Sequence, residues 1–210
     1  MIQLAIDYAN PGTPGTSVAQ TDHQTAAALA AIEATRIWVD KAVIGLNLCP
    51  FAKAVQTRQQ IRYAVSGARH AEELLDDMAN ELRLLADTDP ALLDTTILIH
   101  PYVLTDFLDY NDFLETGDDL VTELGFEGEL QIASFHPDYQ FADTAANDVA
   151  NYTNRSPYPI LHLLREASLE KAIEAYPDVS DIYRRNIETM QRLGHSGWSQ
   201  LGLKSHPDKK

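Results

Sequence analysis

Cysteine is almost absent from this chain. Cys49 is the only cysteine among 210 residues, so the sequence contains no CxxC pair and no partner for an internal disulfide. A lone cysteine is typical of a reducing compartment, and we expect a cytoplasmic protein. Long apolar runs are missing too, because none approaches the ~20 residues that span a bilayer. The start, MIQLAIDYANPG, has no basic region of the kind that opens a signal peptide.

Basic residues are also scarce. The chain has 16 Lys and Arg against 31 Asp and Glu, which gives a formal net charge of -15. Such a surface repels phosphate backbones and anionic lipid head groups, so we expect neither nucleic acid nor a membrane as a partner. A small molecule is the expected partner, and the sequence sets no oligomeric state. With 45% hydrophobic residues the chain has enough apolar side chains for a globular core.

The common catalytic signatures are missing as well. The sequence has no P-loop, GxGxxG, HExxH or GxSxG motif, and no group of cysteines suited to zinc or an iron–sulfur cluster. Large enzyme classes are thereby excluded in their usual forms, and the sequence assigns no cofactor.

The ordered part of the chain is expected to be one domain. Residues 1–24 are rich in Pro, Gly and Thr and are predicted to be flexible, as is the short polar tail 204–210. Between them, residues 25–203 contain no repeat and no linker, which predicts a single α/β domain.

Hydrophobic periodicity defines the expected elements of this domain. Helices are predicted over residues 26–47, 71–86, 106–124, 169–176 and 181–193, with Gly117 interrupting the third and Gly194 ending the last. Strands are predicted over 61–67, 95–101 and 130–137, and the apolar run 160–165 fits a fourth strand better than a helix. Strands that alternate with helices predict a mainly parallel, three- to four-stranded sheet flanked by helices.

Polar residues follow the strands of this predicted sheet. Parallel strands end at one edge, so Ser66, His100 and His136 should lie near one another. Open α/β sheets bind their ligands at that edge, and neighbouring strands lie only ~4.8 Å apart. The sequence therefore predicts a site at the C-terminal edge of the sheet, where two imidazoles could contact one ligand.

Cys49 lies in the segment GLNLCPFAK, and its chemistry depends on the local backbone. If the cysteine ends the preceding helix, the helix dipole disfavours its thiolate. If it caps a new helical turn that starts at Pro50, free N–H groups and Lys53 favour the thiolate. The alternative to a nucleophile is a buried structural cysteine, which the apolar neighbours Leu48 and Phe51 support.

His136 and Asp138 flank a proline in FHPDYQF, which could project the imidazole and the carboxylate from one tight turn. A carboxylate beside an imidazole fixes its tautomer and raises its basicity, as a general base requires. His100 repeats the His-Pro pattern at another strand end. The structural alternative is that Asp138 caps a turn while the imidazoles bind buried carbonyl groups.

The irregular segment after His136 is expected to bind a ligand. Arg155 is suited to hold a carboxylate or a phosphate, with a salt bridge to a nearby acidic residue as the alternative. Aromatic and amide side chains that could line the same pocket are Tyr139, Asn151, Asn154 and Tyr158. The same aromatics could instead hold the long loop against the body of the protein.

Five strings also resemble a known family. VIGLNLCPFAK, TTILIHP, DFLDYNDFL, QIASFHPDYQFAD and NYTNRSPYPILHLLREAS are similar, in this order, to the bacterial family of uncharacterised proteins catalogued as domain of unknown function 1415. The resemblance covers about residues 35–200. It implies a bacterial, cytoplasmic, single-domain protein and transfers no catalytic residue.

Three functions remain open from the sequence. The favoured one is an enzyme, a cysteine-dependent hydrolase or transferase, that acts on a small anionic molecule. In it Cys49 is the nucleophile, His136 or His100 the base, Asp138 the orienting carboxylate and Arg155 the anion ligand. A second is a protein that binds a divalent metal through His100, His136 and Asp138. The third is a non-catalytic binding domain with Cys49 in its core.

Overall fold

The protein is described by a computed structural model over residues 18–174 and 180–203. The segment expected to be flexible, residues 1–24, overlaps this region, because α1 already begins at Val18. Residues 1–17 and the expected tail 204–210 lie outside the described residues. No helix in the described ranges is both long and apolar enough to cross a bilayer.

Four strands and their connecting helices follow the expected order. The strands are β1 (Ile61–Val65), β2 (Thr95–Ile99), β3 (Leu130–Phe135) and β4 (Ile160–Arg165). The α-helices are α1 (Val18–Trp38), α2 (Ala52–Thr57), α3 (Ala71–Asp87), α4 (Phe107–Glu123), α5 (Glu166–Glu174) and α6 (Ser180–Gln200). A π-helix, η1 (Val39–Ile44), continues α1, and a 3-10 helix, η2 (Val149–Thr153), lies in the loop before β4.

The fold is α/β, as expected, but the sheet is mixed rather than mainly parallel. Its strand order is β1-β2-β4-β3, and only β1 and β2 pair in parallel. β4 lies between β2 and β3 and is antiparallel to both. Because both neighbours of β4 oppose it, β1, β2 and β3 still run in one direction and end at one edge.

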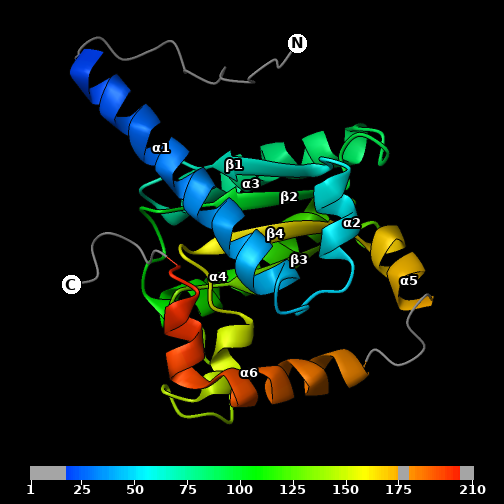
Figure 1. The fold of residues 1–210 in the computed structure, drawn as a ribbon. Coiled ribbons are helices and arrows are strands. Elements are labelled where there is room, and N and C mark those ends of the chain that lie inside the picture. Colours follow the sequence, from blue (N-terminus) through cyan, green and yellow to red (C-terminus); the bar gives the residue numbers. More distant parts are fainter. Residues whose placement is uncertain (1–17, 175–179, 204–210) are drawn as a thin grey trace.

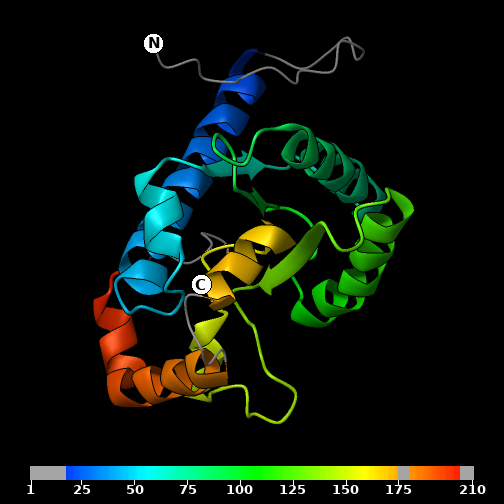
Figure 2. The same ribbon diagram turned by 90° about the vertical axis from the view of Figure 1, so that its right-hand side faces the viewer.

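Helices cover both faces of the sheet (Figures 1 and 2). On one face α3 and α4 enclose a core around Leu82, Leu98 and Tyr110. On the other face α1 and η1 cross the sheet and pack against Ile97 and Ile160. These side chains alternate along each strand, so the central strands β2 and β4 are buried on both sides.

The long N-terminal helix α1 continues into a π-helical segment. From Val39 the backbone follows a π-helix, and the amide of Gly45 donates to the carbonyl of Asp40, five residues earlier. A β-carbon at Gly45 would collide with the backbone carbonyl oxygen of Lys41. Glycine therefore permits this tight turn, and Asn47 then takes a left-handed conformation with φ of 56°. Together they direct the chain away from the helix axis into residues 45–51.

Gly117 and Gly194 have different effects on the helices that contain them. Gly117 was expected to interrupt a helix, but α4 continues through it. A β-carbon there would lie 3.2 Å from Cδ1 of Ile132, so the glycine allows α4 to approach β3 closely. Gly194, in contrast, has φ of 63° and kinks α6 where the sequence predicted a helix end.

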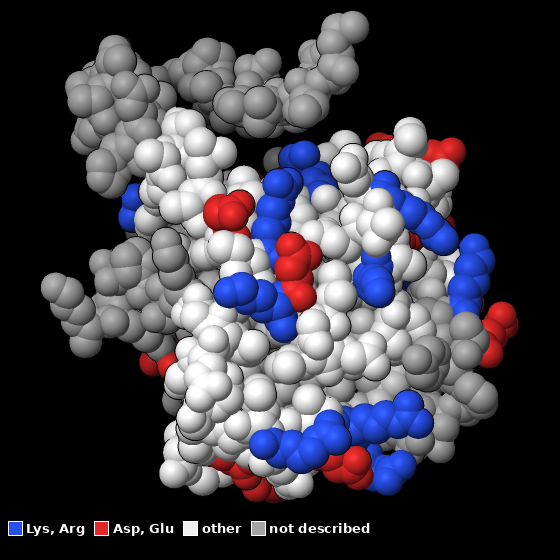
Figure 3. Space-filling view, in the orientation of Figure 1, with Lys and Arg blue, Asp and Glu red and all other residues white. Residues whose placement is uncertain are grey.

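Charge is distributed unevenly between the two faces. α3 and α4 each carry six acidic residues, with a single arginine between them. α6 carries three arginines against two acidic residues. Figure 3 shows basic side chains gathered along α6 at the bottom of the face that α1 crosses. The molecule is acidic overall but has a locally basic surface on this helix.

Candidate functional site

The C-terminal edge of the sheet brings His100 and His136 to the same side of the molecule. They are not direct neighbours, because the segment leading into β4 lies between them. The amide of His100 donates to Pro159 and the amide of His136 donates to Asn154. The two backbones are therefore about two strand spacings apart, ~10 Å. The imidazoles meet through Tyr110 of α4, whose ring centroid lies 5.7 Å from His100 and 5.1 Å from His136.

His100 is fully buried and bound to the backbone. Its Nδ1–H donates a hydrogen bond of 3.0 Å to the carbonyl oxygen of Val103, so Nε2 carries no proton and is a hydrogen-bond acceptor. Nε2 is buried and has no hydrogen-bond partner. The pKa of His100 is lowered to about 4, mainly by desolvation; the Val103 carbonyl opposes the shift and the nearby His136 adds a smaller contribution to it. The imidazole is therefore neutral at neutral pH.

His136 is fully buried as well, and its ring lies between two backbone groups. Nδ1 accepts a hydrogen bond of 3.0 Å from the amide of Asp138, and Nε2 lies 3.3 Å from the carbonyl oxygen of Leu104. Leu104 has φ of 53°, a conformation uncommon for leucine, which turns its carbonyl toward the ring. Asp138 thus contacts His136 through its backbone amide.

Tyr110 joins the strands at this edge, and sequence analysis missed it. Phe135 and Ile160 face each other in the β3–β4 register. The Tyr110 hydroxyl accepts a hydrogen bond of 3.1 Å from the Phe135 amide and donates one of 2.7 Å to the Ile160 carbonyl. In the sequence, only its place on the buried face of a predicted helix could have indicated this role.

The segment between β3 and β4 is held together by its own polar side chains. Asn151 is buried; its Oδ1 accepts from the Phe141 amide and the Thr144 hydroxyl, and its Nδ2 donates to Ala145. Nδ2 of Asn154 donates to the carbonyl of Ser134. Both amides therefore fix the path of the loop.

Arg155 also binds this loop. Its Nε donates to the carbonyl of Tyr139 and its Nη2 to that of Ala146, at 3.2 and 2.7 Å. The guanidinium also lies 4.9 Å from the ring centroid of Tyr152. The described contacts of Arg155 are thus to backbone carbonyls and an aromatic ring, and its role as an anion ligand stays a prediction. Tyr158 is buried in the core under α1, and the Tyr139 ring packs against Phe107 and Phe141.

Cys49 lies elsewhere, in the segment 45–51 that joins η1 to α2 before β1 begins. It is half-buried. Phe51 is the N-cap of α2, which begins at Ala52, and the helical turns of η1 end at Ile44. Cys49 therefore lies between the two helices. Its carbonyl accepts a hydrogen bond of 3.3 Å from the Ala52 amide, so a turn through Pro50 and Phe51 leads from the cysteine into α2. The structure brings His100, His136 and Tyr139 together around α4, while Cys49 belongs to a different segment.

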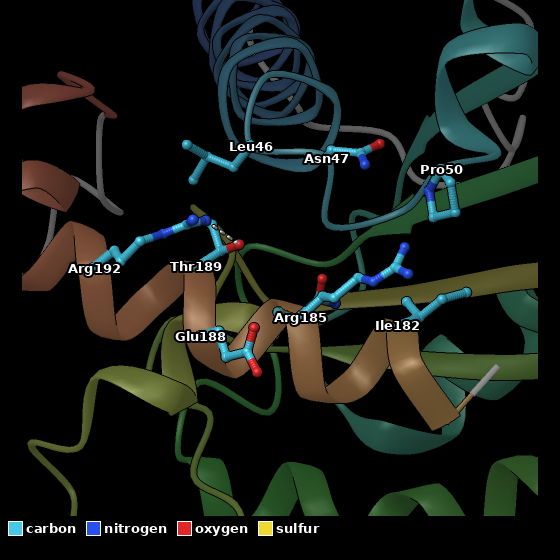
Figure 4. Close-up of a pocket in the computed structure, with 9 residues that line it drawn as sticks. Leu46, Asn47, Pro50, Ile182, Arg185, Glu188, Thr189 and Arg192 are labelled. Carbon is cyan, nitrogen blue, oxygen red and sulfur yellow. Dashed lines mark hydrogen bonds between the residues drawn. The ribbon is translucent and has the colours of Figure 1, made fainter. Parts of the chain in front are cut away.

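A cleft opens between segment 45–51 and α6. Its volume is about 350 Å³, within the size range of small-ligand sites. The lining residues are Leu46, Asn47, Pro50, Ile182, Arg185, Asn186, Glu188, Thr189 and Arg192. Cys49 lies between two of them in the chain. Figure 4 shows the Arg185 and Arg192 side chains rising from α6 toward this segment, while Glu188 points away from it.

A buried hydrogen bond holds the cleft together. Asn186 is 7% exposed, and its Nδ2 donates to the carbonyl of Leu48 at 2.9 Å. Nη2 of Arg192 donates to the Thr189 hydroxyl at 3.2 Å, and Arg184 pairs with Glu188 at 3.4 Å. α6 therefore presents two cationic and two uncharged polar side chains to one cleft: Arg185, Arg192, Asn186 and Thr189. Sequence analysis missed this cleft, although the helical spacing of Arg185, Asn186, Thr189 and Arg192 was visible.

No group of three or more His, Cys, Asp or Glu side chains is placed to hold a metal ion within residues 18–174 and 180–203. The geometry of this part of the chain thus adds no observation in favour of the metal hypothesis.

Residues 30–200 match the sequence model of a protein family of unknown function, DUF1415. The chain belongs to this family. The match includes every residue that lines the cleft and both histidines at the sheet edge, and it confirms the family that the five strings resembled. A search of curated proteins and one of solved structures found no significant match to the chain.

Removing the Tyr110 hydroxyl should destabilise the protein. Tyr110→Phe leaves the Phe135 amide and the Ile160 carbonyl without their shared partner, and we expect a loss of about 1–3 kcal/mol in the free energy of unfolding. Urea unfolding followed by far-UV circular dichroism measures it. Tyr183→Phe, at a side chain that is 54% exposed, is the matched control and should change little. Equal, small effects of both substitutions would contradict the bridging role of Tyr110.

Acid should unfold the protein partly through His100. Its pKa is about 4 in the folded protein against an ordinary value of 6.5, so the unfolded chain binds more protons between these values. This contribution to stability is complete above pH 6.5 and is lost as the pH falls toward 4, by at most about 3 kcal/mol. In His100→Asn the free energy of unfolding should fall less steeply over that window. Part of the slope should remain, because burial also lowers the pKa of His162 to about 4.

The matched control for this experiment is His70→Asn, at an exposed position. Urea unfolding at a series of pH values compares the three proteins. If His100→Asn and His70→Asn both keep the wild-type slope, burial of His100 does not couple its protonation to unfolding.

Proposed function

We propose that this protein binds a small anionic molecule in the cleft between segment 45–51 and α6. The observation that carries the proposal is the presence of Arg185 and Arg192 in one hollow of about 350 Å³. Guanidinium groups are the preferred protein ligands of carboxylate and phosphate groups. Asn47 and Thr189 add uncharged polar groups that can complete the coordination of an anion.

The charge distribution supports the same ligand class. The strongly acidic helices α3 and α4 cover the opposite face of the sheet from α1, while α6 is locally basic. An anion is repelled by the first surface and attracted to the second, which favours its arrival at the cleft. The negative net charge of the protein disfavours anion binding, so a specific anion site requires a local group of basic residues. Arg185 and Arg192 form such a group.

Catalysis on the bound molecule is a further part of this proposal. Cys49 is the candidate nucleophile, because it is half-buried and lies between the lining residues Asn47 and Pro50. That chemistry would be a hydrolase or transferase reaction. His100 and His136 are fully buried and bound to backbone groups, so the proposal gives them no contact with the ligand. We also propose a bacterial, cytoplasmic protein without nucleic acid or membrane partners, which its family and its acidity support.

The arginine variants test the binding proposal. Isothermal titration calorimetry at physiological ionic strength measures the affinity of inorganic phosphate, citrate and suberate. We expect at least one of them to bind, and Arg185→Gln or Arg192→Gln to weaken it about tenfold, the effect of losing one charged hydrogen bond. Arg83→Gln is the matched control, because it removes one positive charge from an exposed position on α3, outside the cleft lining, and should preserve affinity. No binding of any probe, or equal losses in all three variants, would contradict a site in the cleft.

Cys49 provides a second test of where the anion binds. As the only cysteine in the chain, it is the only thiol that iodoacetamide can alkylate. A ligand seated between Asn47 and Pro50 should shield it, so saturating suberate should slow alkylation, measured by intact-mass spectrometry over time. Arg192→Gln should lose this protection at the same suberate concentration. Alkylation at an unchanged rate in a protein shown by calorimetry to be saturated would place the anion elsewhere.

A further inference from the structure

The two arginines of the cleft lie at a fixed spacing along one helix. Arg185 and Arg192 are seven residues apart on α6, before its kink at Gly194. Seven residues make almost two full turns, so both side chains leave the same face, and their Cα atoms are separated by ~10 Å along the axis. One compact anion, such as a phosphate, cannot contact both guanidinium groups at this separation unless the side chains fold toward each other.

The side chains do not fold toward each other. Figure 4 shows the guanidinium of Arg192 beside Thr189 at one end of the cleft and that of Arg185 at the other end, near Ile182 and Pro50. The hydrogen bond from Arg192 Nη2 to the Thr189 hydroxyl holds the first group at its end. The two guanidinium groups therefore lie at separate ends of the cleft.

The middle of the cleft has a different chemistry. Leu46 and Pro50 contribute apolar surface from one wall, and Asn186 and Thr189 contribute uncharged polar groups from the other. The one acidic lining residue, Glu188, pairs with Arg184 and points away from segment 45–51. A ligand that fills the hollow would place an uncharged, partly apolar stretch here, because a charge would find no opposite partner between the arginines.

We infer that the ligand is an elongated molecule with an anionic group at each end and an uncharged chain between them, one end bound by Arg185 and the other by Arg192. This inference rests on the proposed function, since it names the class of anion that the same cleft takes. A linear dicarboxylate whose chain spans the two arginines is the simplest member of the class. Shorter dianions reach only one arginine and lose the second contact.

A series of dicarboxylates tests the spacing directly. Calorimetry of the full-length protein with succinate, adipate, suberate and sebacate should show affinity rising with length until both arginines are reached. Monomethyl suberate, which matches suberate in length but has one charge, should bind about tenfold more weakly, the effect of one charged hydrogen bond. Arg185→Gln and Arg192→Gln should each remove the difference between suberate and its monomethyl ester, while Arg83→Gln, on the exposed surface of α3, should retain it.

The outcomes separate this inference from the proposed function. If the monomethyl ester binds as tightly as suberate, or affinity does not depend on length, the two-ended ligand is wrong even though anion binding stands. The two-ended ligand is also wrong if only one of Arg185→Gln and Arg192→Gln weakens the binding of suberate. If none of the dicarboxylates binds and phosphate and citrate also fail, the anion site itself is wrong. Circular dichroism of each variant confirms that a loss of affinity does not reflect unfolding.

Discussion

The hydrogen bond between the Asn186 side chain and the Leu48 carbonyl is the interaction on which the proposed site depends. It joins residues 138 positions apart in the sequence, and it is buried. A buried carbonyl without a partner is costly, and Leu48 lies outside regular secondary structure, so an external donor is required. Asn186 supplies that donor and thereby docks α6 against segment 45–51. The cleft lies beside this contact, and Asn186 is one of the residues that line it.

The geometry of segment 45–51 has a local cause in the sequence. The π-helix η1 shifts the hydrogen-bond register, Gly45 allows the tight turn, and Asn47 accepts a left-handed backbone. π-helical turns are rare and occur frequently at functional sites. Here the π-helix positions the wall of the cleft that carries Cys49. On the opposite side of the segment, the kink of α6 at Gly194 lets Trp198 stack on Tyr152 at 4.7 Å, which secures the end of α6.

Most of the secondary structure follows from the sequence, because its signals are local. Alternating apolar residues bounded by Ser-Gly or His-Pro located β1, β2 and β3 to within two residues, and the β-branched and leucine-rich run after Pro159 was correctly assigned as a strand. The position of β4 was not predicted, because hydrophobic pattern shows that a strand is buried and not which strands flank it. Because β4 lies antiparallel between β2 and β3, His100 and His136 are not direct neighbours. The common direction of β2 and β3 was predicted correctly.

The candidate site was harder to predict than the fold. Residue types drew attention to His100, His136 and Arg155, and each of them is bound to backbone carbonyls or amides that stabilise the loops. Polar residues at strand ends satisfy buried backbone groups as readily as they bind ligands, and the sequence does not distinguish these roles. The sequence does not set the arginines of α6 apart from ordinary surface charges, since only the tertiary contact through Asn186 places them opposite segment 45–51.

A crystal structure of the protein in complex with suberate tests the central claim most directly. The account predicts density for one extended ligand between segment 45–51 and α6, with one carboxylate against Arg185, the other against Arg192, and the Asn186 hydrogen bond to Leu48 intact. Density for the ligand at the sheet edge beside His100 and His136, or a cleft closed by α6 lying directly on segment 45–51, would contradict it.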